Sequence, residues 1–138
     1  MIELDPASND IAQQQVQAQT YYTKDDDGLE KDWKGKVFMN PRYQAGLIDK
    51  FASKLCQHFK AGDVPSAVVL VNNATETDWF GKMAKLASAV CFPEKRIKFL
   101  RPNGVAGSPL QGQAFLYLGN NTQAFLNTFQ KFGKVWRE

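Results

Sequence analysis

Cysteine and histidine are scarce in this chain of 138 residues, which has two cysteines and one histidine. Cys56 and Cys91 lie far apart, each within an apolar pattern, so we expect reduced core residues and no disulfide scaffold. His58 falls near the end of a predicted helix, and no partner motif points to it. Because no cysteine, histidine or carboxylate spacing of a metal site is present, we expect no metal.

Long hydrophobic runs and a targeting segment are also absent. No apolar run approaches the roughly 20 residues that cross a bilayer, and the N-terminus lacks the basic, apolar and small-residue order of a secretory signal. We therefore expect a cytoplasmic protein without a membrane partner. Its length, with 43% hydrophobic and 22% charged residues, is that of a single domain over residues 1–138.

Net charge is weak, since the formal value of +3 permits contact with nucleic acid without arguing for it. The basic residues are nevertheless unevenly distributed. A short segment holds Lys95, Arg96, Lys98 and Arg101, and a loop rich in glycine and proline follows at 101–111. Such a segment is either a solvated face or a binding surface.

Apolar runs alternate with amphipathic patterns along the chain, which is typical of an α/β domain. Continuous apolar runs predict buried strands, and apolar residues at three- and four-residue spacing predict helices. Strands are expected at 36–39, 67–71 and 114–118, with an edge strand at 135–136, and helices at about 9–19 and 45–59 and around the apolar stripes at 79–90 and 125–132.

The segment from Val37 to Tyr43 carries the strongest functional signal. A short apolar run ends in Asn40 and Pro41, so these residues are predicted at the carboxyl end of a buried strand, where open α/β sheets bind ligands. The amide carbonyl of Asn40, the main-chain carbonyl of Pro41 and the ring of Tyr43 can together hold the exocyclic amino group of a nucleobase. A proline-containing turn after a strand is the alternative.

Two acidic segments precede this one. Asp5 opens a loop of small residues that ends at Ser8 and leads into a predicted helix, which suits a polar, charged cofactor, although a capping or turn role is the alternative. Asp27 stands beside Gly28 and the apolar Leu29, and a carboxylate next to an apolar side chain can bind an adenine ring. A glycine turn with a solvated acid is the alternative there. No G-x-G-x-x-G motif is present.

The order of these segments resembles the phage-type DNA N-6-adenine methyltransferases, often described as Dam-like and found in bacteriophages and prophages. The resemblance covers nearly the whole chain, and the ordered set of motifs is more specific than any one of them. The motifs are Leu4-Asp5-Pro6-Ala7-Ser8, Tyr21-Tyr22-Thr23, Asp27-Gly28-Leu29, Trp33, Val37-Phe38-Met39-Asn40-Pro41-Arg42-Tyr43, Thr77-Asp78-Trp79-Phe80 and Arg96-Ile97-Lys98-Phe99.

The resemblance implies a Rossmann-like methyltransferase fold, with a mostly parallel seven-stranded sheet and helices on both faces. It also implies S-adenosylmethionine as methyl donor, adenine in DNA as substrate and the host cytoplasm as the place of action. By motif, the catalytic residues are Asn40, Pro41 and Tyr43. The cofactor-binding residues are Asp5, Pro6, Ala7, Ser8, Asp27, Leu29 and Asn40. For DNA contact we expect Arg42, Arg96, Lys98 and Arg101.

Two departures from the family pattern leave a second reading open. Arg42 stands where the Asn-Pro-Pro-Tyr motif has its second proline, so a long cation replaces a ring that fixes φ. The helix with a Thr-Pro segment that usually precedes the first strand is absent, so we expect an N-terminally shortened form. The alternative to an active enzyme is therefore a degenerate relative that binds nucleic acid or cofactor without turnover. The sequence leaves the oligomeric state and the recognised DNA sequence open.

Overall fold

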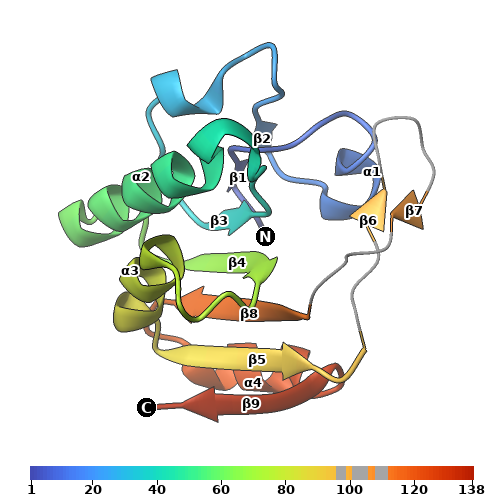
Figure 1. The fold of residues 1–138 in the computed structure, drawn as a ribbon, viewed down its shortest axis with the longest axis vertical. Coiled ribbons are helices and arrows are strands. Elements are labelled where there is room, and N and C mark those ends of the chain that lie inside the picture. The colour runs from blue at the N-terminus through green and yellow to red at the C-terminus, as the bar shows by residue number, and fades with distance from the viewer. Residues whose placement is uncertain (96–98, 101–105, 108–111) are drawn as a thin grey trace.

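A seven-stranded sheet in the order β2-β1-β3-β4-β8-β5-β9 forms the centre of the protein (Figure 1). The structure is a computed structural model that describes residues 1–95, 99–100, 106–107 and 112–138. A separate pair consists of β6 (Phe99–Leu100) and β7 (Ala106–Gly107). The strands of the main sheet are β1 (Leu4–Asp5), β2 (Thr20–Tyr21), β3 (Val37–Met39), β4 (Ala67–Asn72), β5 (Ala89–Pro93), β8 (Gln113–Leu118) and β9 (Gly133–Arg137).

The relative direction of neighbouring strands changes at β4. The pairs β1–β2, β1–β3 and β3–β4 are parallel, whereas β4–β8, β5–β8 and β5–β9 are antiparallel. The expectation of a mostly parallel sheet is therefore wrong for the half of the sheet beyond β4. The apolar run at 114–118 correctly indicated a buried strand, but burial on both faces carries no information about strand direction.

Two hydrophobic clusters cover the two faces of the sheet, as the alternation of strand side chains requires. On one face, Val69 and Leu116 pack with α2 (Leu47–Ala61) and α3 (Asp78–Leu86). On the other face, Leu70 and Phe115 pack with α4 (Thr122–Phe129). Helices thus lie on both faces, and none of those in the described ranges is long and apolar enough to cross a membrane.

The segment before β2 is less helical than the sequence indicated. The predicted helix at 9–19 is reduced to α1 (Gln13–Val16), because Gln17 adopts a left-handed conformation with φ of 55° and ends it. By contrast, α2 lies close to its expected bounds, and the residues that flank it, Gly46 and Gly62, are both glycines with positive φ. Two short 3₁₀ turns complete the described elements, η1 (Gly28–Glu30) and η2 (Gln44–Gly46).

Trp33 anchors the irregular chain between β2 and β3. Its side chain is fully buried, and its indole Nε1 donates a hydrogen bond of 2.8 Å to the carbonyl oxygen of Gly28. The ring stacks at a centroid distance of 6.0 Å on both Phe51 and His58 of α2. This single side chain therefore ties η1 to α2, where regular secondary structure is scarce.

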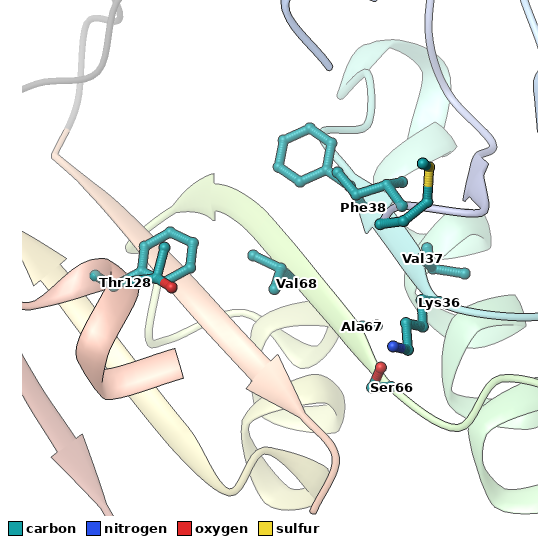
Figure 2. A pocket seen from close by; sticks show the side chains of 10 residues that line it. Lys36, Val37, Phe38, Ser66, Ala67, Val68 and Thr128 are labelled. Carbon is teal, nitrogen blue, oxygen red and sulfur yellow. The ribbon is translucent and has the colours of Figure 1, made fainter. Parts of the chain in front are cut away.

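A hollow of about 360 Å³ lies away from the predicted site residues. It opens beside α4, where Phe38 of β3 and Val68 of β4 project on the side of the sheet that carries Thr128 (Figure 2). Met1 and Lys36 also line it. Within the described ranges, none of the residues predicted to bind cofactor or DNA lines this hollow.

Replacing Trp33 with Phe should destabilise the protein because the carbonyl of Gly28 loses its buried donor. We expect the free energy of unfolding to fall by about 1–3 kcal/mol in urea titration. The same substitution at Trp136, which is 59% exposed on the edge strand β9, should change it by less than about 0.5 kcal/mol. Equal effects at the two positions would contradict the role given to Trp33.

Candidate functional site

The carboxyl ends of β1, β3 and β4 lie at one edge of the sheet because these strands run parallel. Three polar residues occupy those ends, Asp5 on β1, Asn40 directly after β3 and Asn72 on β4. In Figure 1 the ends of β3 and β4 point to the same side of the molecule. The edge is where an open α/β sheet binds ligands, so it is the candidate site.

Asp5 is a buried acid, with only 2% of its surface exposed. Its carboxylate accepts hydrogen bonds from the side-chain amide of Gln13 at 2.9 Å and from the main-chain N–H of Ala7 at 3.4 Å. Burial raises its pKa to about 6, which outweighs the lowering effect of these hydrogen bonds. A carboxyl group in such surroundings gains most from a cationic partner, so this position suits a ligand with a positive charge.

Gln13 connects the residues around Asp5, a role that was not apparent for one of three consecutive glutamines. Its amide nitrogen donates to both Asp5 and the hydroxyl of Ser8 at 2.9 Å, and its carbonyl accepts from the N–H of Ala18 at 2.8 Å. One side chain thus connects the loop after β1 with the chain that enters β2. A spacing pattern cannot reveal such a role, because it depends on a left-handed turn at Gln17.

The two segments predicted to bind cofactor lie against each other. The approach of Gly28 to the carbonyl oxygen of Pro6 is so close that an added Cβ would lie 2.1 Å from it. The N–H of Ser8 also donates to the carbonyl of Tyr22 at 2.8 Å. The structure therefore brings residues 5–8 and 27–29 together, and only glycine fits at position 28.

Asp27 and Leu29 flank this contact. Asp27 has a positive φ of 54°, and its carboxylate accepts from the N–H of Leu29 at 3.3 Å. Asp27 is exposed and Leu29 is half-buried, and both line a groove of about 570 Å³ between η1 and α2. Asp27 and Leu29 thus offer a hydrogen-bond acceptor and an apolar surface at the rim of a groove whose other lining residues are mostly polar or charged.

Asn40 and Pro41 follow β3 at the same edge. Pro41 is buried, Asn40 is half-buried, and within the described part of the chain no hydrogen bond holds the Asn40 side chain. Its amide carbonyl can therefore accept a hydrogen bond from a ligand. Since Leu4 of β1 pairs with Val37 of β3, the segment that contains Asp5 and the segment that contains Asn40 come from neighbouring strands.

Tyr43 bridges from the chain after β3 to β4. Its hydroxyl accepts a hydrogen bond of 2.8 Å from the main-chain N–H of Asn72, and its ring lies 5.8 Å from that of Trp79 on α3. Tyr43 is 38% exposed and Trp79 is 8% exposed. The sequence indicated Tyr43 as a site residue, whereas Trp79 stood in a family motif and on the apolar stripe of a helix without a site role.

The residues predicted to contact DNA are only partly described. The guanidinium of Arg42 lies 5.9 Å from the ring centroid of Phe51, so the Arg42 side chain packs near the start of α2. Arg96, Lys98 and Arg101 lie outside the described residues. Within the described ranges, no group of three or more histidines, cysteines and acids is placed to hold a metal ion.

Replacing Asp5 with Asn should alter the dependence of stability on pH. The pKa of Asp5 rises from 3.8 to about 6 on folding, so the folded protein holds this proton more tightly than the unfolded chain does. The associated stability is present below pH 4 and is lost as the pH rises through about 6, a loss of about 3 kcal/mol at 1.36 kcal/mol per pKa unit.

The measurement is urea unfolding of wild type and of Asp5→Asn at intervals between pH 4 and pH 7. The free energy of unfolding of the wild type should decrease over this range, and that of the variant should not. Asp32→Asn, at an exposed position, is the matched control and should retain the wild-type profile. A wild-type profile in Asp5→Asn would show that burial does not raise the pKa of Asp5.

Comparison with known proteins identifies the chain. No curated protein matches it. A family model described as DNA N-6-adenine-methyltransferase (Dam) matches residues 2–116, which include β1, β3, β4 and every residue of the candidate site. This chain therefore belongs to the DNA N-6-adenine-methyltransferase (Dam) family.

Proposed function

We propose that this protein transfers a methyl group from S-adenosylmethionine to the N-6 amino group of adenine in DNA, as a phage-type modification enzyme. One observation carries the proposal. The Asn40-Pro41-Arg42-Tyr43 segment follows β3 at the same sheet edge where β1 ends in the buried acid Asp5. Membership of the Dam family supports adenine in DNA as the substrate.

The chemistry of the residues proposed to bind the cofactor supports this donor. Asp5 is a buried carboxylate, and the neighbouring Ala7 and Ser8 are buried residues with small side chains. Asp27 and Leu29 offer an acceptor and an apolar surface to the adenine of the cofactor. When bound, S-adenosylmethionine supplies an electrophilic methyl group on a sulfonium.

The chain's own contribution to the reaction is to position the amino group. The lone pair of the adenine N-6 nitrogen is delocalised into the ring, which makes it a weak nucleophile. If the side-chain carbonyl of Asn40 and the main-chain carbonyl of Pro41 accept its two hydrogens, the nitrogen can become tetrahedral and attack the methyl carbon. With the donor bound, the sulfonium would supply the methyl group to this nitrogen, and the proton that the nitrogen then loses would pass to water.

Adenine in a duplex cannot reach these acceptors, so the base has to leave the stack. Tyr43 offers the extruded base a partly exposed aromatic ring beside Asn40. Arg42, Arg96, Lys98 and Arg101 are proposed to contact phosphates, which would make the affinity for DNA dependent on salt.

We also propose that the fold is the Rossmann-like fold of methyltransferases. The parallel half of the sheet, the helices on both faces and the antiparallel β8 between β4 and β5 support it. Such a fold places the cofactor over the carboxyl ends of the parallel strands. Among the residues proposed to bind cofactor, Asp5 ends β1 and Asn40 follows β3 at that edge.

A degenerate relative that binds nucleic acid or cofactor without turnover is the second candidate. Arg42 favours it, because a flexible residue replaces the proline that fixes φ in the motif. The two candidates differ in one observable. Incorporation of tritiated methyl into DNA by the purified protein would exclude the second candidate.

Replacing Asn40 with Ala should reduce methyl transfer to adenine-containing DNA by at least about a hundredfold, since one of the two acceptors is lost. The assay is incorporation of labelled methyl from S-adenosylmethionine, with the unfolding midpoint measured in parallel. Asn127→Ala, on the exposed face of α4, is the matched control and should retain wild-type activity. Normal transfer by Asn40→Ala would remove the role assigned to this residue.

Titration calorimetry with S-adenosylmethionine tests the cofactor site directly. We expect saturable binding to one site, with an affinity that decreases as the pH falls below about 6, because protonation of Asp5 removes its negative charge. Asp5→Asn should bind more weakly at pH 7.5 and lose this pH dependence. Absence of saturable binding by the wild type would contradict the proposed cofactor, and equal affinity of Asp5→Asn would contradict the role of Asp5.

A further inference from the structure

Trp79 is an aromatic residue at the candidate site that the Asn-Pro-Arg-Tyr motif does not include. It lies in the first turn of α3, where the hydroxyl of Thr77 caps the helix by accepting from the N–H of Phe80 at 3.3 Å. Its ring meets that of Tyr43 at a centroid distance of 5.8 Å and an interplanar angle of 62°. This is the edge-to-face geometry that aromatic pairs prefer.

Tyr43 is held at a second point by β4. The main-chain N–H of Asn72, the last residue of β4, donates to the Tyr43 hydroxyl at 2.8 Å. The polar tip of the side chain is therefore fixed by one element and its ring by another. With 38% of its surface exposed, Tyr43 still offers aromatic area to a ligand.

The backbone around Tyr43 gives little help in holding it. The chain between β3 and α2 is irregular, since Ala45 has a positive φ of 52° and no side chain caps η2 or the start of α2. Arg42 precedes Tyr43 and lacks the ring with which proline would fix φ. A tyrosine in such a segment would otherwise sample several rotamers, and ordering it on binding would cost conformational entropy.

We propose that Trp79 and the main-chain amide of Asn72 are positioning groups that hold Tyr43 as a preformed stacking surface for the extruded adenine. The proposal rests on the proposed function, because the adenine is the substrate named there. Trp79 itself is not a catalytic residue in this account. It acts through Tyr43, and it takes over the ordering that a second proline would otherwise provide.

The first test needs no substrate. Burial raises the pKa of the Tyr43 hydroxyl, while the hydrogen bond from Asn72 lowers it by a smaller effect. Carbon-13 NMR titration of labelled tyrosines in the ligand-free protein follows this pKa, with the Tyr43 signal assigned through Tyr43→Phe. In Trp79→Leu the pKa of Tyr43 should move down toward the ordinary value of 10.0, because the ring becomes more exposed. In Trp79→Phe, which keeps an aromatic edge, it should stay near the wild-type value.

The second test is steady-state methyl transfer to DNA with S-adenosylmethionine as donor. Trp79→Leu should lower kcat by about tenfold or more and leave the affinity for S-adenosylmethionine within about twofold, because misplacing the stacking surface affects the reacting geometry. Trp79→Phe should restore most of kcat. If Trp79 only filled the core, Trp79→Leu would lower the unfolding midpoint without lowering kcat selectively, and Trp79→Phe would not restore kcat.

Phe125→Leu is the control for a loss of buried aromatic volume. Phe125 is 3% exposed and stacks on Tyr117, in the hydrophobic cluster on the opposite face of the sheet. It should lower stability and leave both the pKa of Tyr43 and kcat unchanged.

The outcomes separate this inference from the proposed function. If the pKa of Tyr43 in Trp79→Leu matches that in Phe125→Leu, the positioning role is overturned whether or not the protein methylates DNA. If the pKa shifts but kcat does not fall in an active protein, the role in stacking is overturned. If the wild type transfers no methyl group, the proposed function fails, while the titration still decides whether Trp79 holds Tyr43.

Discussion

The parallel pairing of β1, β3 and β4 is the constraint on which the candidate site depends. Because these strands run in one direction, the residues that end them meet at one edge, although Asp5, Asn40 and Asn72 are widely separated in the sequence. The antiparallel strands β8 and β9 add width and hydrophobic core to the sheet, and the amino end of β8 reaches the same edge, where Gln113 pairs with Asn72. Asp5, Asn40 and Asn72 therefore come from the parallel half, whereas strands of both halves contribute to the hydrophobic core.

At Asp5, the requirements of the proposed cofactor site and of stability are in conflict. A buried carboxylate with a raised pKa is unfavourable in the empty protein at neutral pH, and the amide of Gln13 offsets only part of that cost. A cationic ligand would remove the penalty and bind more tightly as a result. The close contact between Gly28 and Pro6 also restricts the sequence. It joins two loops, and it leaves no space for a side chain at position 28.

Much of the fold followed from the sequence where periodicity was strong. The helix expected at 45–59 is α2, the apolar run at 67–71 is β4, and the edge strand expected at 135–136 is part of β9. The order of motifs indicated the Dam family, which the family match confirms. The failures have a common physical cause. Strand direction in the second half of the sheet and the shortening of α1 depend on tertiary pairing and on single backbone angles, which residue patterns do not encode.

The candidate site was predictable to a similar extent. The residues with distinctive chemistry, among them Asp5, Asn40 and Tyr43, could be named because their types and positions after strands are informative. The roles of Gln13 and Trp79 could not be named, since a glutamine among glutamines looks like a surface residue and Trp79, although part of a family motif, also fits an apolar core stripe. Their contacts with Asp5 and Tyr43 exist only after distant segments have come together.

The position of β8 has a consequence for how the protein is made. β8 lies in the middle of the sheet and pairs Leu118 with Ala67, yet it follows β4 and β5 in the sequence. During synthesis the edges of β4 and β5 leave the ribosome before the strand that separates them, and their backbone groups remain unpaired until residues 113–118 emerge. Contacts of such large sequence separation form slowly, and unpaired strand edges favour aggregation in the interval. Because β8 lies between β4 and β5, the nascent chain is exposed to aggregation until translation of β8 is complete.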